Sequence, residues 1–221
     1  MKKKIAFIFF ILFSPLALDA TAHQPRLVMG DRNSASNPIL IEEPEVSKAF
    51  YAQIEKSDQY YRIGSSKEFN LYLGLQLPDI PLQSKKITLE LVDKSGTQLI
   101  RLDGSNHDWT KFHENFGNAD YLDGPSAQIF LPAGVYSIKI SGQENTKYVL
   151  VAGYKEEFPA SEIFNSIFLV PKINNEFFVM NIFQSLWNVF GFMLLSIFGI
   201  IGFTSILLGK RIRRYMIENK I

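Results

Sequence analysis

The side chains best suited to chemistry gather between residues 103 and 124, where two of the three histidines lie among several carboxylates. Calcium is a hard cation that binds roughly six to eight oxygen ligands, many of them from Asp and Asn side chains. The candidate calcium ligands are Asp103, Asn106, Asp108 and Asp123. Their spacing does not match an EF-hand loop. We expect the protein to need no cofactor, with calcium as the possible exception.

A zinc site is a weaker hypothesis for the same segment. Its ligands would be His107, His113 and Glu114. The two histidines are six residues apart, and neither helical nor strand periodicity supports this spacing as a ligand pair.

The aromatic residues of this segment allow two interpretations. Trp109, Phe112 and Phe116 follow a spacing of i, i+3 and i+7, which predicts a short helix packing one aromatic face on the rest of the domain. Alternatively, the aromatic side chains form a platform that binds a sugar or a peptide. The candidate ligand-binding residues are then Trp109, Phe112, Phe116 and Tyr121.

The sequence contains no pattern typical of an enzyme. The absence of cysteine excludes a thiolate metal site and a cysteine nucleophile. There is no Gly-x-Ser-x-Gly, no His-Glu-x-x-His and no glycine loop of the kind that binds phosphate. A net charge of +1 gives no basic excess for nucleic acid. We therefore expect a protein that is not an enzyme and binds no nucleic acid.

The N-terminus has the pattern of a secretory signal peptide, predicted at residues 1–22. Three lysines precede the apolar run Ile5–Leu18, and Ala20-Thr21-Ala22 has the small residues of a cleavage site. The mature chain would begin at His23.

A second apolar segment near the C-terminus predicts a transmembrane helix over 177–209. Leu186–Leu208 is 23 residues long without a charge, which as a helix spans about 34 Å, enough for a bilayer core of roughly 30 Å. Four basic residues follow between Lys210 and Arg214. By the positive-inside rule, they predict a basic cytoplasmic tail at 210–221 and place residues 23–176 outside.

Small and polar residues form one stripe along this predicted helix. Small residues let two helices approach closely in lipid, and side-chain amides can hydrogen-bond between them. The stripe predicts a helix–helix interface with a second copy or another membrane protein. The candidate interface residues are Asn181, Gln184, Asn188, Gly191, Gly202, Ser205 and Gly209.

The segment between the two apolar runs predicts an all-β fold, a jelly-roll-like β-sandwich ectodomain over 23–158. Apolar and polar residues alternate in short runs separated by turn residues, most clearly over 69–77 and 87–92. A juxtamembrane helix and linker at 159–176 follow. The helix is predicted over 161–170, before Pro171, and either lies on the membrane or packs on the sandwich.

Several motifs resemble the bacterial pre-peptidase C-terminal domain. They are Asp58–Ile63, Ile87–Asp93, Leu131–Ile140 and Tyr148–Val151, within about half of the chain. The resemblance implies a small jelly-roll-like sandwich that usually accompanies secreted enzymes. The order of signal peptide, sandwich, span and short tail is analogous to cargo receptors with a GOLD domain, but the cysteine pair and coiled-coil stem of those proteins are absent.

Together these features predict a non-enzymatic, single-pass membrane protein that presents a binding or accessory module within a membrane assembly. The alternative is a surface receptor that binds carbohydrate or calcium through residues 103–124. The lack of cysteine and of Asn-x-Ser/Thr sequons favours a bacterial envelope. We expect the inner or cytoplasmic membrane, with the ectodomain in the periplasm or at the cell exterior.

Overall fold

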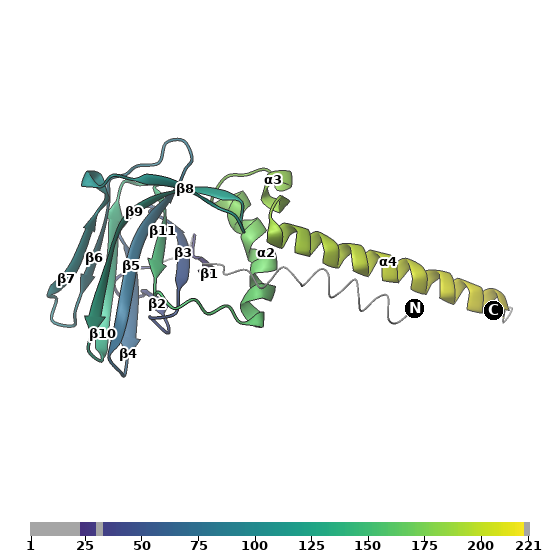
Figure 1. Cartoon of the computed structure of the whole chain (residues 1–221), viewed down its shortest axis with the longest axis horizontal. Helices are drawn as coiled ribbons and strands as arrows, with labels where there is room; N and C mark the ends of the chain where they lie inside the picture. The colour runs from purple at the N-terminus through teal and green to yellow at the C-terminus, as the bar shows by residue number, and fades with distance from the viewer. Residues whose placement is uncertain (1–22, 30–32, 219–221) are drawn as a thin grey trace.

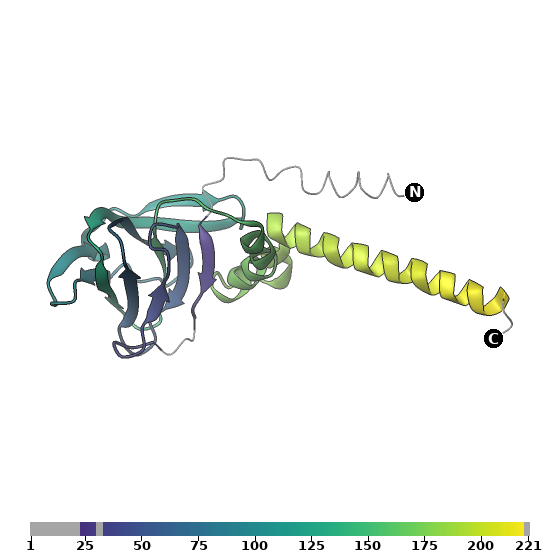
Figure 2. The same cartoon turned by 90° about the horizontal axis from the view of Figure 1, so that it is seen from below.

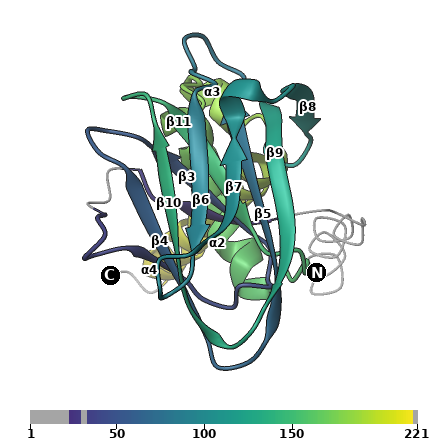
Figure 3. The same cartoon turned by 90° about the vertical axis from the view of Figure 1, so that its left-hand side faces the viewer.

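The predicted β-sandwich is confirmed by the computed structural model, which describes residues 23–29 and 33–218 (Figure 1). Eleven strands form two sheets in this part of the chain, and the sheets face each other (Figure 3). The predicted signal peptide lies outside the described residues.

The six-stranded sheet runs in the order β1 (Gln24–Leu27), β3 (Lys48–Gln53), β11 (Lys147–Ala152), β5 (Phe69–Pro78), β9 (Ala119–Leu131), β8 (Thr110–Glu114). The five-stranded sheet runs in the order β2 (Ile39–Ile41), β4 (Gln59–Ser65), β10 (Gly134–Gly142), β6 (Ile87–Val92), β7 (Gln98–Asp103).

The main core lies between the two sheets and follows the alternation in the sequence. On β5, Leu71, Leu73 and Leu75 point inward and are fully buried. Leu89 and Leu91 of β6 meet them from the opposite sheet. Alternate residues of a strand point to opposite faces, so the period of two in the sequence becomes one buried face.

A second core covers the outer face of the six-stranded sheet. Helix α2 (Ala160–Glu176) packs there, and its residue Ile173 joins Phe177 against Val149 and Val151 of β11. Because both faces of β11 are covered, all residues from Tyr148 to Ala152 are buried. A strand buried on both faces has a continuous apolar sequence rather than an alternating one.

Helix α2 is longer than predicted. It begins at Ala160 and continues through Pro171 to Glu176, whereas the sequence predicted an end before Pro171. A proline inside a helix costs about 3 kcal/mol. Burial of Pro171, Ile173 and Asn174 under the sheet offsets this cost. Of the two alternatives for this helix, the buried face of α2 therefore packs on the sandwich.

The predicted short helix at Trp109–Phe116 is wrong. A 3₁₀ turn, η2 (Gly104–Asn106), is followed by strand β8, which pairs antiparallel with β9. Phe112 lies opposite Tyr121, with ring centroids 5.0 Å apart and planes 14° apart. The helical spacing of the aromatics is outweighed by hairpin pairing with β9, the next strand along the chain.

The predicted single helix over 177–209 is also corrected. The chain forms a short helix, α3 (Ile182–Leu186), then a break, then α4 (Val189–Glu218), which extends away from the sandwich (Figure 2). Helix α4 is long and apolar enough to cross a membrane, with a mean hydropathy of 2.2 over its most apolar 18 residues, and it is almost wholly exposed. It continues through the basic cluster, so the predicted tail is helical as far as Glu218.

Candidate functional site

Three hydrogen bonds connect the sandwich to the helices at one place, which we call the joint. The joint consists of the β8–β9 turn (115–118), Asn174 of α2 and the segment 187–189 between α3 and α4. The backbone N–H of Val189 donates to the carbonyl of Phe116 (3.2 Å). The side-chain amide of Asn118 donates to the carbonyl of Trp187 (2.9 Å). The buried amide of Asn174, on α2, donates to the carbonyl of Gly117 (2.6 Å).

The β8–β9 turn is held in shape by its own residues. The Glu114 carboxylate accepts hydrogen bonds from the backbone N–H groups of Phe116 and Gly117, both at 2.7 Å. Asn118 has a φ of 54°, in the left-handed region that Asn tolerates better than most residues. These contacts point the carbonyls of Phe116 and Gly117 toward the helices.

The break before α4 uses residues that the sequence assigned to a helix–helix interface. Asn188 is buried: its amide donates to the Ser185 carbonyl (2.7 Å), and its oxygen accepts from the N–H of Gly191 (2.8 Å). A Cβ at Gly191 would lie 2.2 Å from the Leu186 carbonyl oxygen. Asn188 and Gly191 therefore shape the chain's own turn.

The other predicted interface residues divide into two groups. Asn181 and Gln184 form a capping box at the start of α3, in which the Asn181 side chain accepts from the N–H of Gln184 (3.0 Å). Gly202, Ser205 and Gly209 are exposed on α4. The predicted stripe is thus interrupted, and only its second half lies on one continuous helix.

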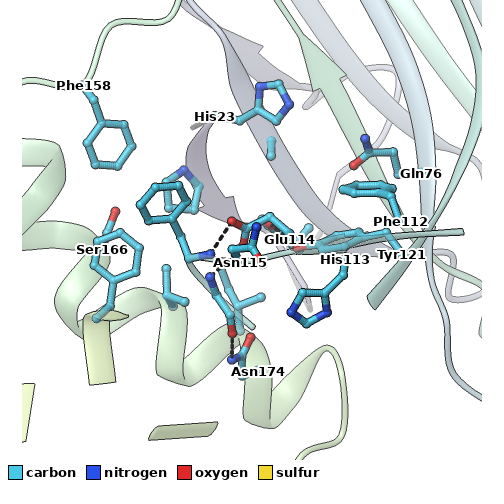
Figure 4. A pocket seen from close by; sticks show the side chains of 18 residues that line it. His23, Gln76, Phe112, His113, Glu114, Asn115, Tyr121, Phe158, Ser166 and Asn174 are labelled. Atoms are coloured by element: carbon cyan, nitrogen blue, oxygen red, sulfur yellow. Dashed lines mark hydrogen bonds between the residues drawn. The ribbon is translucent and has the colours of Figure 1, made fainter. Parts of the chain in front are cut away.

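A cavity of about 250 Å³ lies beside the joint, between the outer face of the six-stranded sheet, α2 and the start of α4 (Figure 4). Three of the four predicted ligand-binding residues line it: Phe112, Phe116 and Tyr121. Phe158 and Phe190 add apolar surface from the α2 and α4 sides. A largely apolar cavity with a few polar groups is the usual form of a small-ligand site.

Hydroxyl groups supply part of the polar surface in and around this cavity. The hydroxyls of Tyr51 and Tyr121 hydrogen-bond each other at 2.9 Å, and burial raises the pKa of both phenols, so both stay protonated at neutral pH. Ser166 is fully buried on α2, and its Oγ has no hydrogen-bond partner among the residues that the structure describes. A ligand atom that bonded this hydroxyl would relieve a buried unpaired group.

His23 lines the cavity from the start of β1, a role that the sequence did not indicate. Its Nδ1 lies 2.5 Å from Ser47 Oγ, a short hydrogen bond. Burial lowers the pKa of this imidazole, and the nearby Asp123 carboxylate opposes the shift. His23 is therefore held in its neutral form.

Trp109 does not belong to the cavity. Its indole packs against Gly104 and Gly124, and Nε1 donates to the Gly104 carbonyl at 2.7 Å. A Cβ at Gly124 would lie 2.4 Å from the indole ring. Trp109 thus covers the edge of the main core, and the structure separates it from Phe112, Phe116 and Tyr121.

The structure does not bring the four calcium candidates together as a set of ligands. Asp103 accepts from the N–H of Ser105 (2.9 Å) and caps η2, close to Asn106. Asp123 instead accepts from the Gln76 amide (3.1 Å) on the six-stranded sheet. Asp108 is exposed after η2. Calcium binding stays a prediction.

The zinc candidates point to separate partners. His113 hydrogen-bonds Asp120 across the β8–β9 pair at 2.7 Å, whereas the His107 ring packs against Trp109. Glu114 is used by the β8–β9 turn. Among residues 23–29 and 33–218, no group of three or more His, Cys, Asp or Glu side chains is placed to hold a metal ion.

Several solved structures resemble the chain, and two of them show how distant the similarity is. No family model and no curated protein matches the chain. The pre-peptidase C-terminal domain of collagenase from Bacillus anthracis is 10% identical, with a TM-score of 0.30, covering 62% of this chain and all of that domain. A β-glucosidase from Paenibacillus barengoltzii is 14% identical, with a TM-score of 0.25, covering 61% of this chain but only 14% of the enzyme. The first belongs to the family that the sequence motifs resemble.

We predict that Asn174→Ala destabilises the protein by about 1–3 kcal/mol, because it leaves the buried Gly117 carbonyl unpaired. The measurement is thermal or chemical unfolding of the full chain in detergent. Asn165→Ala is the matched control, since Asn165 is exposed on the same helix. Equal stability of the two variants would contradict the role of Asn174.

We also predict that His23 makes stability fall under mild acid. The folded protein resists protonating this buried imidazole, while the unfolded chain protonates it near its ordinary pKa of about 6.5. Protonation therefore favours unfolding, and stability present above about pH 6.5 is lost as the pH falls. The melting temperature of the unmodified protein should drop more between about pH 7.5 and about pH 5.5 than that of His23→Gln. Parallel plots of melting temperature against pH for the two proteins would refute this.

Proposed function

We propose that this chain is a non-enzymatic, single-pass membrane protein of a bacterial envelope that holds a β-sandwich module in a defined orientation at the membrane within a larger assembly. The observation that carries the proposal is the joint. It bonds the β8–β9 turn of the sandwich directly to the first residue of the apolar helix α4. A module tethered only to stay near a membrane would need no such contact, since a flexible linker is enough.

The exposed surface of α4 supports the membrane part of this proposal. A bilayer core of roughly 30 Å needs about 20 apolar residues, and α4 has 30 residues with little contact to the sandwich. Lys210, Arg211, Arg213 and Arg214 follow its apolar part. They orient the C-terminus toward the cytoplasm and the sandwich toward the outside.

The second half of the small-residue stripe supports association with another helix. Gly202 and Gly209 are exposed, and a Cβ added at either would meet no atom within 4 Å. Ser205 lies between them and is also exposed. Such a surface lets a second membrane helix approach closely, either from another protein or from a second copy.

The experiment is affinity purification of the tagged full chain from native membranes in mild detergent, followed by mass spectrometry and crosslinking. We expect a stoichiometric membrane partner or a homodimer. The double variant Gly202→Leu and Gly209→Leu should reduce the recovered partner or homodimer about tenfold, which corresponds to about 1.4 kcal/mol of association free energy. Thr204→Leu is the control because Thr204 is also exposed on α4 but lies about 160° around the helix from Gly202, on the opposite face.

Gly191 stays unchanged in this test, because a side chain there would disturb the break before α4. Recovery of the protein alone, or equal recovery of the partner by the double variant and the control, would contradict association through α4.

A second candidate function is a receptor that binds carbohydrate through the cavity. The specific observation is that Phe112, Phe116 and Tyr121 line one cavity that also contains the unpaired Ser166 hydroxyl. The probe is a glycan array applied to the full chain in detergent. Phe112→Ala should weaken any binding about tenfold, whereas Phe130→Ala, an exposed phenylalanine outside the cavity, should not. No binding, or equal binding by both variants, would remove this candidate.

A further inference from the structure

Large aromatic side chains remain exposed on the helices that connect the sandwich to α4. Phe164 and Phe168 on α2 are each 58% exposed, Phe183 on α3 is 83% exposed, and Trp187 is 67% exposed. Val179 and Ile182 are exposed between them. Apolar residues gathered in this way usually mark a surface that contacts a partner.

The exposed face of α2 is opposite the face that packs on the sandwich. Successive residues of a helix are about 100° apart, so Phe164 lies about 180° from the buried Ile173. Phe168 lies within one turn of Phe164, on the same exposed face. Ile173 packs on the outer face of the six-stranded sheet, so this exposed face points away from the sandwich.

The direction of α2 relative to α4 indicates that this exposed face contacts lipid. Figures 1 and 2 show α2 between the sandwich and α4, running across the direction of α4. If α4 crosses a bilayer, α2 lies along the membrane surface, and its exposed face is turned toward the lipid.

Chain connectivity fixes the depth of these residues. Trp187 is two residues before Val189, the first residue of α4, and its ring lies 5.2 Å from that of Phe192 in the first turns of α4. A residue this close to the start of a spanning helix lies at interfacial depth, where Trp and other aromatics are enriched. The joint then holds α2 at a similar level.

The polar residues around this face agree with a headgroup layer. Lys172 follows Phe168 by one turn and is exposed, so its ammonium can reach lipid phosphates. Glu176 lies 3.9 Å from it, and Glu162 is paired with Arg26 at 2.9 Å. No unpaired carboxylate of α2 faces the membrane side in the described part of the chain.

We propose that the exposed face of α2 and α3 lies in the headgroup layer of the bilayer, as a second membrane contact beside the span. This proposal rests on α4 crossing the membrane. The contact fixes the sandwich with its six-stranded sheet toward the membrane and its five-stranded sheet away from it. Helices with one apolar face commonly lie in the interface in this way.

The absence of cysteine permits a direct test on the full chain. Single variants Phe168→Cys, Phe183→Cys, Leu40→Cys and Phe198→Cys are labelled with an environment-sensitive NBD dye in nanodiscs of phosphatidylcholine and phosphatidylglycerol. Leu40 on β2 is the matched control, because it is 63% exposed on the sheet far from α4. Phe198 on α4 reports the span itself.

We expect dyes at 168 and 183 to emit at shorter wavelength and to be quenched by lipids that carry a quencher near the headgroup. The dye at 40 should be quenched only by aqueous iodide, and the dye at 198 by a quencher deep in the acyl chains. An aqueous dye at 168 with an immersed dye at 198 would overturn this proposal alone. An aqueous dye at 198 would overturn the span and the proposed function with it. Shielding at 168 from both iodide and lipid quenchers would show a protein partner instead, which also overturns the lipid contact.

A second variant separates orientation from folding. A dye at Ser161→Cys, which is exposed and lies about 20° from Phe168 around α2, should move from a lipid to an aqueous environment when Phe164 and Phe168 are both changed to serine. The melting temperature should stay the same, because both side chains are exposed in the protein itself. With the dye at Leu40→Cys instead, changing both phenylalanines to serine should leave the environment of the dye unchanged. A dye that stays in lipid in the double variant would contradict the role of the two phenylalanines.

Discussion

The hydrogen bonds of the joint satisfy backbone groups that neither the sandwich nor the helices can satisfy alone. Val189 begins α4, where the first N–H groups of a helix have no intrahelical acceptor. Trp187 ends α3, where the last carbonyls lack a donor. The β8–β9 turn supplies Phe116 O for the first and the Asn118 amide for the second. The direction of α4 relative to the sandwich therefore depends on this four-residue turn, which Glu114 holds in shape, together with the packing of α4 against α2.

The six-stranded sheet links this joint to the rest of the fold because its strand β11 is buried on both faces. Leu150 points into the main core, while Val149 and Val151 point to α2. The predicted boundary between 158 and 159 thus separates two segments that pack together as one unit. Helix α2 belongs to the folded domain, and the proline within it is tolerated because tertiary packing offsets the lost hydrogen bond.

The same elements form the cavity, the joint and the face proposed to contact lipid. One side of α2 presents Ser166 and Asn174 to the cavity and the turn, and the other presents Phe164 and Phe168 to the outside. This shared construction is consistent with a module whose position matters to a larger assembly, since an anchor alone would require none of it.

Local patterns in the sequence were enough to predict the main strands, the sandwich and the apolar helix. Burial of one strand face makes apolar and polar residues alternate, and a helix exposed along its length to lipid needs a long apolar run. The alternation of leucines from Leu71 to Leu77 is an example. Pairing between strands and hydrogen bonds from a side chain to the backbone leave no such pattern. Phe112 became part of a strand because Tyr121 lies opposite it, and the helical spacing with Trp109 had no influence. Asn188 closes a break between two helices through its own side chain, although its spacing matched a continuous stripe. Only the tertiary structure decided these cases, because the partner that stabilises each residue is chosen by packing and by the need to pair backbone groups.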